Sequence, residues 1–244
     1  MLYAEVRFAP QLHQKKGLTQ EEVVKAAVLG MQEALAGSFF KANLILCCMR
    51  GGDNREANLQ TVRTAASFLG RGVAAVDLAG AEALYPTADF GEIFAFARKL
   101  GVPFTIHAGE ADGPESIRAA LKFGACRIGH GVRAQEDEDV WEFLKEHRIP
   151  LEMCPASNVQ TKAVKNFQEH PVLSYLRSGL LVTVNTDNMT VSDTTIEKEY
   201  ERLSGELGMT AKEHRQLLFN AADAAFLSGE EKGRLKDVIG KVLG

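Results

Sequence analysis

The sequence contains no hydrophobic run approaching the roughly 18–20 consecutive apolar residues of a membrane-spanning helix. We also expect no leader in which basic residues precede an apolar stretch, because strand-like sequence follows Met1 directly. Its four cysteines include no C-x-x-C pair, so thiolate zinc ligation has no supporting spacing. These absences predict a cytoplasmic protein with no membrane partner.

Cysteine itself is scarce, and its placement indicates a reducing compartment. The cysteines lie within apolar segments that are typical of buried strands, and two of them are adjacent. We therefore expect buried free thiols rather than disulfides at all four positions. The positions are Cys47, Cys48, Cys126 and Cys154.

Charge of one sign is not in large excess either. The 28 Lys and Arg residues are opposed by 32 Asp and Glu residues, which gives a formal net charge of −4. Such a weakly acidic chain has no electrostatic basis for binding nucleic acid or an anionic membrane surface. We expect neither partner, and a composition of 45% hydrophobic and 25% charged residues is that of an ordinary globular protein.

Strand-like and helix-like segments alternate along the chain, which is typical of a parallel-sheet α/β fold. Helix starts are expected at Thr19, Thr194, Thr210 and Ser228, of which all but Thr194 open a capping box. No linker divides residues 1–244, so we expect one domain: a (β/α)8 barrel short of its first strand, with extra C-terminal helices. The predicted strands are residues 3–8, 42–49, 72–78, 103–107, 125–129, 149–153 and 180–185.

The first predicted strand leaves two interpretations open. Its residues alternate, so that Tyr3, Glu5 and Arg7 share one face. In a half-exposed strand this charged face would meet water. In a barrel strand it would face the interior near the mouth.

Potential metal ligands and acid–base groups follow several predicted strands directly. His107 with Glu110 ends the fourth strand, His130 the fifth and Asp187 the seventh. The carboxyl ends of neighbouring parallel strands meet at one edge of the sheet, where α/β folds build their sites. We therefore expect these four side chains to converge.

This set of side chains suits metal-assisted hydrolysis. An open catalytic zinc site takes nitrogen and oxygen ligands and keeps one position for water. The metal lowers the pKa of that water toward ~7, while a nearby His can take its proton and a Glu can protonate the group under attack. The set therefore predicts attack on an unsaturated carbon with Zn²⁺ as the cofactor.

Each residue also has an ordinary structural interpretation. A single His at a strand end is more often a hydrogen-bonded structural residue, and an Asp after a strand is most often a helix cap. What favours chemistry is that all four occur at strand ends. The other histidines fall in predicted loops or helices and are expected to be solvated or to cap a helix: His13, His147, His170 and His214.

Longer motifs carry a resemblance to a known family. In chain order they are TIHAGE at 105–110, RIGHG at 127–131, LEMCPASN at 151–158 and TVNTDN at 183–188, and YAEVRFAP at 3–10 and AVDLAG at 75–80 accompany them. Together they closely resemble the adenosine deaminase family, from Met1 to about residue 227. The resemblance implies a (β/α)8 barrel with one zinc that converts adenosine or deoxyadenosine to inosine or deoxyinosine and ammonia.

The resemblance also implies a role for each matching residue. His107 and Asp187 would be zinc ligands, and His130 would orient or deprotonate the zinc-bound water. Glu110 would protonate the purine ring at N1, which breaks its aromaticity and makes C6 electrophilic. The backbone of Gly80 would lie close to the purine, where a side chain is unwelcome.

Two departures from the family pattern matter. Asn188 stands where many members have a second Asp that hydrogen-bonds purine N7. An amide can also donate to that nitrogen, so we expect altered affinity rather than lost activity. The family's first strand carries a His-x-His pair that supplies two zinc ligands, and this sequence has no His-x-His. We expect an N-terminally truncated barrel, with a degenerate homologue as the alternative, and poor activity of the isolated chain.

Other functions remain open beside adenosine deamination. Related barrels share HAGE and GHG, so the substrate could be adenine or another aminopurine. A non-catalytic barrel that binds nucleoside or a protein partner is a further alternative, although Glu110 and His130 are both present. A nucleic-acid base deaminase is disfavoured, because the H-x-E and P-C-x-x-C signature is missing. We expect a free purine nucleoside as the small-molecule partner.

Overall fold

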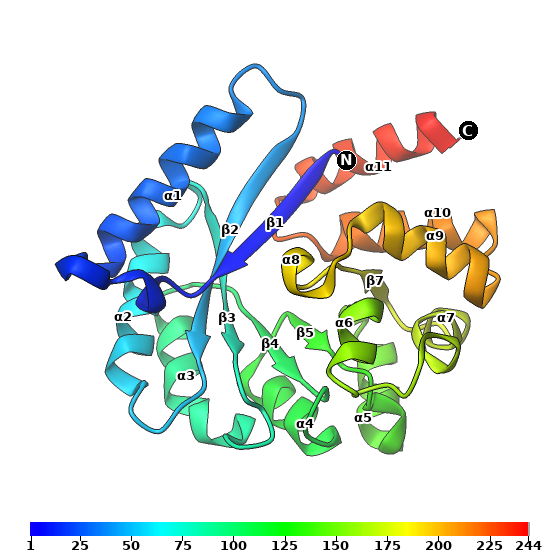
Figure 1. Ribbon diagram of the computed structural model, residues 1–244, viewed down its shortest axis with the longest axis horizontal. Coiled ribbons are helices and arrows are strands. Elements are labelled where there is room, and N and C mark those ends of the chain that lie inside the picture. The colour runs from blue at the N-terminus through cyan, green and yellow to red at the C-terminus, as the bar shows by residue number, and fades with distance from the viewer. Residues whose placement is uncertain (244) are drawn as a thin grey trace. The chain divides into compact units, whose positions relative to one another are not determined.

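The computed structural model describes residues 1–243, and the chain divides into two compact units. Unit 1 comprises Met1–Ile106 with Phe123–Ala125, and unit 2 comprises His107–Lys122 with Cys126–Gly244. Each unit contains parallel strands and the helices that follow them (Figure 1).

Unit 1 is built on a parallel sheet in the order β1-β2-β3 (Tyr3–Phe8, Lys41–Met49 and Val73–Ala79). The central strand β2 is buried from Leu44 to Cys48, as a strand covered on both faces requires. Helix α2 packs along β2 and β3 (Figure 1). The helices of this unit are α1 (Gln20–Leu35), α2 (Arg55–Phe68) and α3 (Gly91–Lys99), with short 3-10 helices η1 (Pro10–His13), η2 (Lys15–Gly17) and η3 (Thr87–Phe90).

The charged face of β1 is half-buried, and its Arg7 reaches a carboxylate in the core of unit 1. Arg7 Nη1 lies 3.0 Å from Oδ2 of Asp77, a residue of β3 that is completely buried. Tyr3 donates a hydrogen bond from its hydroxyl to Glu5 along the same face. Of the two interpretations of this strand, the structure shows the interior one, because a buried carboxylate is stabilised when a cation is its partner.

A second sheet has the order β4-β5-β6-β7 (Thr105–Ala108, Arg127–His130, Leu151–Met153 and Val182–Val184), and all of it except Thr105 and Ile106 belongs to unit 2. The pairs β5–β6 and β6–β7 are parallel, with Gly129 opposite Glu152 and Glu152 opposite Thr183. Helices α7, α9 and α10 pack on β7. The helices are α4 (Pro114–Phe123), α5 (Glu138–Glu146), α6 (Pro155–Gln160), α7 (Val172–Arg177), α8 (Met189–Ser192), α9 (Ile196–Leu207), α10 (Ala211–Ala224) and α11 (Gly229–Leu243), with 3-10 helices η4 (Ala134–Glu136) and η5 (Phe167–Glu169).

The predicted strands and helix starts are largely confirmed. Each of the seven predicted strands overlaps one of the strands β1 to β7, and the capping boxes at Thr19 and Thr210 open α1 and α10. Ser228 and Glu231 exchange the same hydrogen bonds before α11. Only the start predicted at Thr194 is displaced, by one residue, because Thr195 is the residue whose side chain caps α9.

After β6 the chain forms the short helix α6, in which Pro155 occupies the first turn, where its missing N–H costs nothing. One local prediction was wrong. Cys126 is exposed, since it precedes β5 rather than lying within it, whereas Cys47, Cys48 and Cys154 are buried free thiols as predicted.

The sequence has no apolar run long enough for a membrane-spanning helix, and the helices agree with this. Among residues 1–243, no helix combines the length and apolar character that crossing a bilayer requires.

Candidate active site

Glycines allow the chain to bring two predicted site residues together at the ends of β4 and β5. A Cβ on Gly129 would lie 3.0 Å from the Cα atom of His107, so only glycine lets β5 run this close to β4. At Gly109, φ is +69°, and a Cβ there would lie 2.5 Å from the Cδ1 atom of Ile117. Close packing therefore explains why Gly109 of the HAGE motif and Gly129 of the GHG motif are glycines.

Two of the predicted site residues have an unusual backbone conformation. His130 has a φ of 61° and Asp187 a φ of 53°, both in the left-handed region that non-glycine residues rarely adopt. Such conformations persist only where surrounding contacts enforce them, and they cluster at functional sites. The strain is consistent with a functional role for both strand ends.

Three of the four predicted chemical groups converge in unit 2. The imidazole rings of His107 and His130 are 4.9 Å apart between centroids, and His130 Nε2 lies 3.5 Å from Glu110 Oε2. Thr161 donates from its hydroxyl to Glu110 Oε1 at 2.9 Å. These contacts hold a carboxyl group against an imidazole in a largely buried setting, where His130 is 2% exposed.

Asp187 is attached to the same region through α6. Ser157 donates a hydrogen bond from Oγ to Asp187 Oδ2 at 2.7 Å. The next residue of α6, Asn158, contacts His130 Nδ1 at 2.9 Å and Glu110 Oε1 at 3.4 Å. One short helix thus positions the predicted ligand and both predicted acid–base groups.

The two predicted substrate-binding residues are placed differently from each other. Asn188 is exposed and caps α8, since its Oδ1 accepts from the backbone N–H of Val191 at 3.0 Å. That contact occupies Oδ1, so a purine nitrogen would be met by the Nδ2 donors. Gly80 belongs to unit 1, where its φ of 108° by itself favours glycine without any ligand.

Sequence reasoning missed two buried polar residues, Asn158 and His170. His170 was expected to be solvated or to cap a helix, but it is 4% exposed. Its Nε2 lies 3.2 Å from Asn158 Oδ1. Burial, and to a lesser extent the charge of His130, lowers the pKa of His170 to about 3, so it stays neutral. No local pattern distinguishes this histidine from a solvated one.

The donor set can be tested against a zinc ion. His107 and Asp187 offer an imidazole nitrogen and a carboxylate, which zinc accepts. Within residues 1–243, however, no three His, Cys, Asp or Glu side chains are grouped so that they could hold a metal ion. A catalytic zinc has three protein ligands, so the described residues do not complete a zinc site by themselves.

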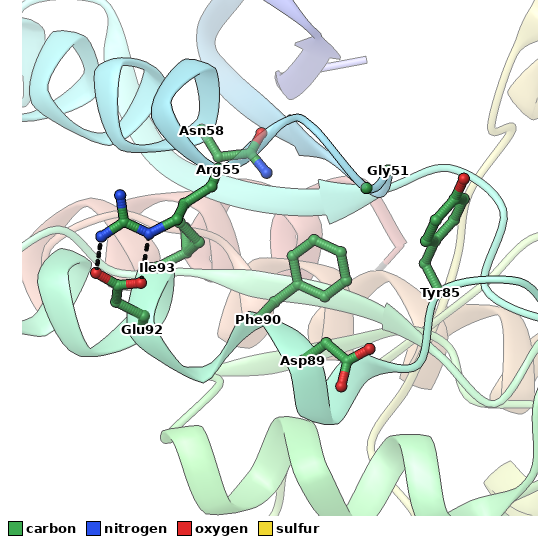
Figure 2. A pocket seen from close by; sticks show the side chains of 9 residues that line it. Gly51, Arg55, Asn58, Tyr85, Asp89, Phe90, Glu92 and Ile93 are labelled. Atoms are coloured by element: carbon green, nitrogen blue, oxygen red, sulfur yellow. Dashed lines mark hydrogen bonds and ion pairs between the residues drawn. The ribbon is translucent and has the colours of Figure 1, made fainter.

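Unit 1 has a separate cleft of about 280 Å³ at the carboxyl end of β2 (Figure 2). Gly51 and Tyr85 lie on one side of it, and Phe90 lies near its middle. Arg55 and Glu92 form an ion pair across its rim, with Arg55 Nε 2.7 Å from Glu92 Oε2. None of the predicted site residues lines this cleft.

The adenosine deaminase family model matches residues 1–242. This chain belongs to the adenosine deaminase family. An adenosine deaminase from Haemophilus ducreyi is 54% identical over 239 residues, which cover 96% of this chain and 70% of the relative. One from Clostridium botulinum is 42% identical over 243 residues, which cover 99% of this chain and 72% of the relative. These similarities support a deaminase enzyme acting on adenosine-like purines.

Solved structures show the same fold. The adenine deaminase of Arthrobacter aurescens has a TM-score of 0.91 at 27% identity and covers 99% of this chain and 74% of its own. An N6-mAMP deaminase from Arabidopsis has a TM-score of 0.87 at 26% identity, with coverages of 99% and 73%. The predicted α/β barrel class is confirmed, and neither described sheet closes on itself, as expected of an incomplete barrel.

Proposed function

We propose that this chain belongs to an enzyme that hydrolyses the 6-amino group of adenosine or deoxyadenosine, releasing inosine or deoxyinosine and ammonia in purine salvage. The observation that carries the proposal is the juxtaposition of Glu110 and His130, 3.5 Å apart, beside the imidazole of His107. An acid that can protonate a ring nitrogen, next to an imidazole that can orient water, is what hydrolytic deamination requires.

Glu110 is the proton donor in this proposal. A proton delivered to purine N1 breaks the aromaticity of the ring and makes C6 open to attack by water. Thr161 and Asn158 both approach Glu110 Oε1, so its other oxygen faces His130. The amide of Asn188 would donate to purine N7. The role of Gly80 beside the purine stays a prediction from the resemblance.

The metal part of the proposal concerns His107 and Asp187. We assign them as the two zinc ligands that this chain supplies, with Ser157 holding the carboxylate. Zinc, when bound, lowers the pKa of water toward ~7. Because two ligands are fewer than the three of a catalytic site, the isolated chain is expected to bind zinc weakly and to deaminate adenosine poorly.

A second candidate substrate class is another aminopurine. The structural neighbours include an adenine deaminase and an N6-mAMP deaminase, each at more than 25% identity. The same Glu110 and His130 would serve either substrate, because the chemistry at C6 is shared. The substrate panel below separates these possibilities.

The test compares the 244-residue chain with a longer version to which the family's His-x-His strand is added. Both are loaded with zinc and given adenosine, deoxyadenosine, adenine and N6-methyl-AMP, and ammonia release is measured. We expect the longer version to deaminate adenosine and the isolated chain to be poorly active. Glu110→Gln in the longer version should lower kcat by about 100-fold or more.

The matched control is Glu115→Gln, which changes an exposed carboxylate on α4 and should leave kcat unchanged. Full activity of Glu110→Gln would refute the assigned acid. Stoichiometric zinc and rapid inosine formation by the 244-residue chain alone would refute the expected impairment. Turnover of adenine but not adenosine would refute adenosine as the substrate and assign adenine instead.

A further inference from the structure

A chain of hydrogen bonds in unit 2 determines where the protons of two buried histidines lie. It begins at the backbone of α7, where the N–H of Val172 donates to Nδ1 of His170 at 3.2 Å. A backbone N–H can only donate, so this ring nitrogen must be unprotonated. His170 is neutral because burial lowers its pKa to about 3. Its proton is therefore on Nε2.

The next link is the side-chain amide of Asn158, which is completely buried. Two donors meet its oxygen: His170 Nε2 and the backbone N–H of Cys154, each at 3.2 Å from Oδ1. The Cys154 N–H excludes the flipped amide, in which an NH₂ group would face a donor. The orientation of Asn158 is thus set by the main chain as well as by His170.

The amide nitrogen of Asn158 then points at the candidate site. Nδ2 lies 2.9 Å from Nδ1 of His130, and an amide NH₂ only donates. His130 Nδ1 is consequently the acceptor of this bond. When His130 is neutral, its single proton must be on Nε2, the nitrogen that lies 3.5 Å from Glu110 Oε2.

We propose that Asn158, held in orientation by His170, is a positioning residue that keeps neutral His130 in the Nε2–H tautomer. In the opposite tautomer, the N–H of His130 Nδ1 would face the N–H of Asn158 Nδ2. His130 and His170 are only 2% and 4% exposed, so water could not supply the missing hydrogen bonds. The resemblance left open whether His130 orients or deprotonates water. This consequence rests on the proposed deaminase function. In that enzyme, neutral His130 would donate a hydrogen bond from Nε2 to the attacking water, so it would orient the water rather than take its proton.

The experiment reads the tautomer by NMR and needs neither zinc nor turnover. The 244-residue chain is labelled with ¹⁵N-histidine, and long-range ¹H–¹⁵N spectra are recorded at a pH where His130 is neutral. The His130 signals are assigned by their loss in His130→Gln. We expect the Nε2–H pattern at His130 and at His170 in the unaltered chain.

The decisive variant is Asn158→Asp, which replaces the donor facing His130 Nδ1 by an acceptor. His130 should then carry a proton on Nδ1. Asn158→Ala is the second variant, in case the buried carboxylate prevents folding, and it should give a mixture of the two tautomers. Circular dichroism checks that each variant is folded.

The matched control is Asn185→Asp, which adds the same charge in unit 2 at a residue whose Nδ2 donates to Thr183 Oγ1 instead. It should leave the His130 tautomer unchanged. A wild-type His130 that carries its proton on Nδ1 would overturn the proposal, as would a folded Asn158→Asp with the wild-type pattern. Absence of deaminase activity in the longer version would overturn the proposed function and leave this tautomer assignment standing.

Discussion

Arg127 is the residue that connects the sheet of unit 2 to the end of α10. Its Nε lies 2.6 Å from Glu152 Oε1 on the neighbouring strand, and both side chains are 6% exposed. Its Nη1 donates to the carbonyl oxygen of Ala224 at 2.9 Å, and its guanidinium lies 3.8 Å from the centre of the Phe226 ring. A single cation thus satisfies a buried carboxylate and a helix-terminal carbonyl together.

Breaking this pair from one side should be costly. Arg127→Met leaves the Glu152 carboxylate buried without its cation, and we expect the free energy of unfolding to fall by about 3 kcal/mol. The double variant Arg127→Met/Glu152→Leu removes both charges of this pair, so most of that loss should be recovered. Urea denaturation of the wild type and both variants measures this. A double variant less stable than the single one would contradict the account.

Among the elements, α10 shows how a helix start can be strengthened from outside. Its capping box pairs Thr210 with Glu213, and Arg177 of α7 adds an ion pair, with Nε 2.6 Å from Glu213 Oε1. The hydrogen bond from Arg177 and those from Thr210 lower the pKa of Glu213 to about 2. A carboxyl group whose pKa is lowered by folding stabilises the folded state above its unfolded pKa, and loses that effect as the pH falls toward the folded value.

We therefore expect Glu213→Gln to lower Tm by about 2 °C at pH 7, because glutamine keeps the capping box but loses the ion pair. The difference from wild type should shrink as the pH falls from about 4.5 toward about 2, where the wild-type carboxyl also becomes neutral. Thermal melting followed by circular dichroism over this pH range measures it.

The matched control is Glu22→Gln in the capping box of α1. Thr19 and Glu22 exchange the same hydrogen bonds, but no ion pair of Glu22 is found within residues 1–243. Its effect at pH 7 should be smaller than that of Glu213→Gln. Equal effects of the two substitutions would mean that Arg177 contributes nothing to α10.

The short helix α6 depends on its tertiary surroundings. Glu199 of α9 accepts from the backbone N–H of Ala156 at 3.2 Å and from Thr194 Oγ1 at 2.7 Å, which places a carboxyl group at the N-terminus of α6. Burial raises the pKa of Glu199, and these hydrogen bonds oppose the shift. A helix of six residues has little stability of its own, so contacts with α9 explain why it forms.

At the scale of the whole molecule, the sheets have open edges. Strand β1 pairs with β2 on one side, and within residues 1–243 no further strand pairs with it. Val6 in this strand is 54% exposed. An edge strand with one unpaired side and an exposed apolar side chain is a template for pairing with another chain.

We expect the 244-residue chain to associate as its concentration rises, and Val6→Lys to reduce this association, because a charged side chain on an edge strand opposes pairing. Light scattering coupled to size-exclusion chromatography measures the mass at several concentrations. Leu12→Lys is the control: Leu12 is 61% exposed but lies outside the strands. Equal effects would indicate general solubility rather than the strand edge.

The sequence by itself determined the elements and the list of chemical groups. Alternation of apolar runs with capping boxes predicted the strands and most helix starts, because these depend on residues within a few positions of one another. It also placed His107, Glu110, His130 and Asp187 at strand ends. Because a parallel fold brings such ends to one edge of the sheet, the sequence predicted that these residues converge. The family motifs pointed to the same residues.

Only the tertiary structure decided which polar groups support the site. Asn158 meets His130 across 28 positions and His170 across 12, and Arg127 meets Ala224 across 97. Hydropathy patterns record whether a residue is apolar, and they carry no information on which distant donor faces which acceptor. For that reason His170 was mistaken for a solvated histidine, and the tautomer of His130 became visible only once the main chain had fixed Asn158.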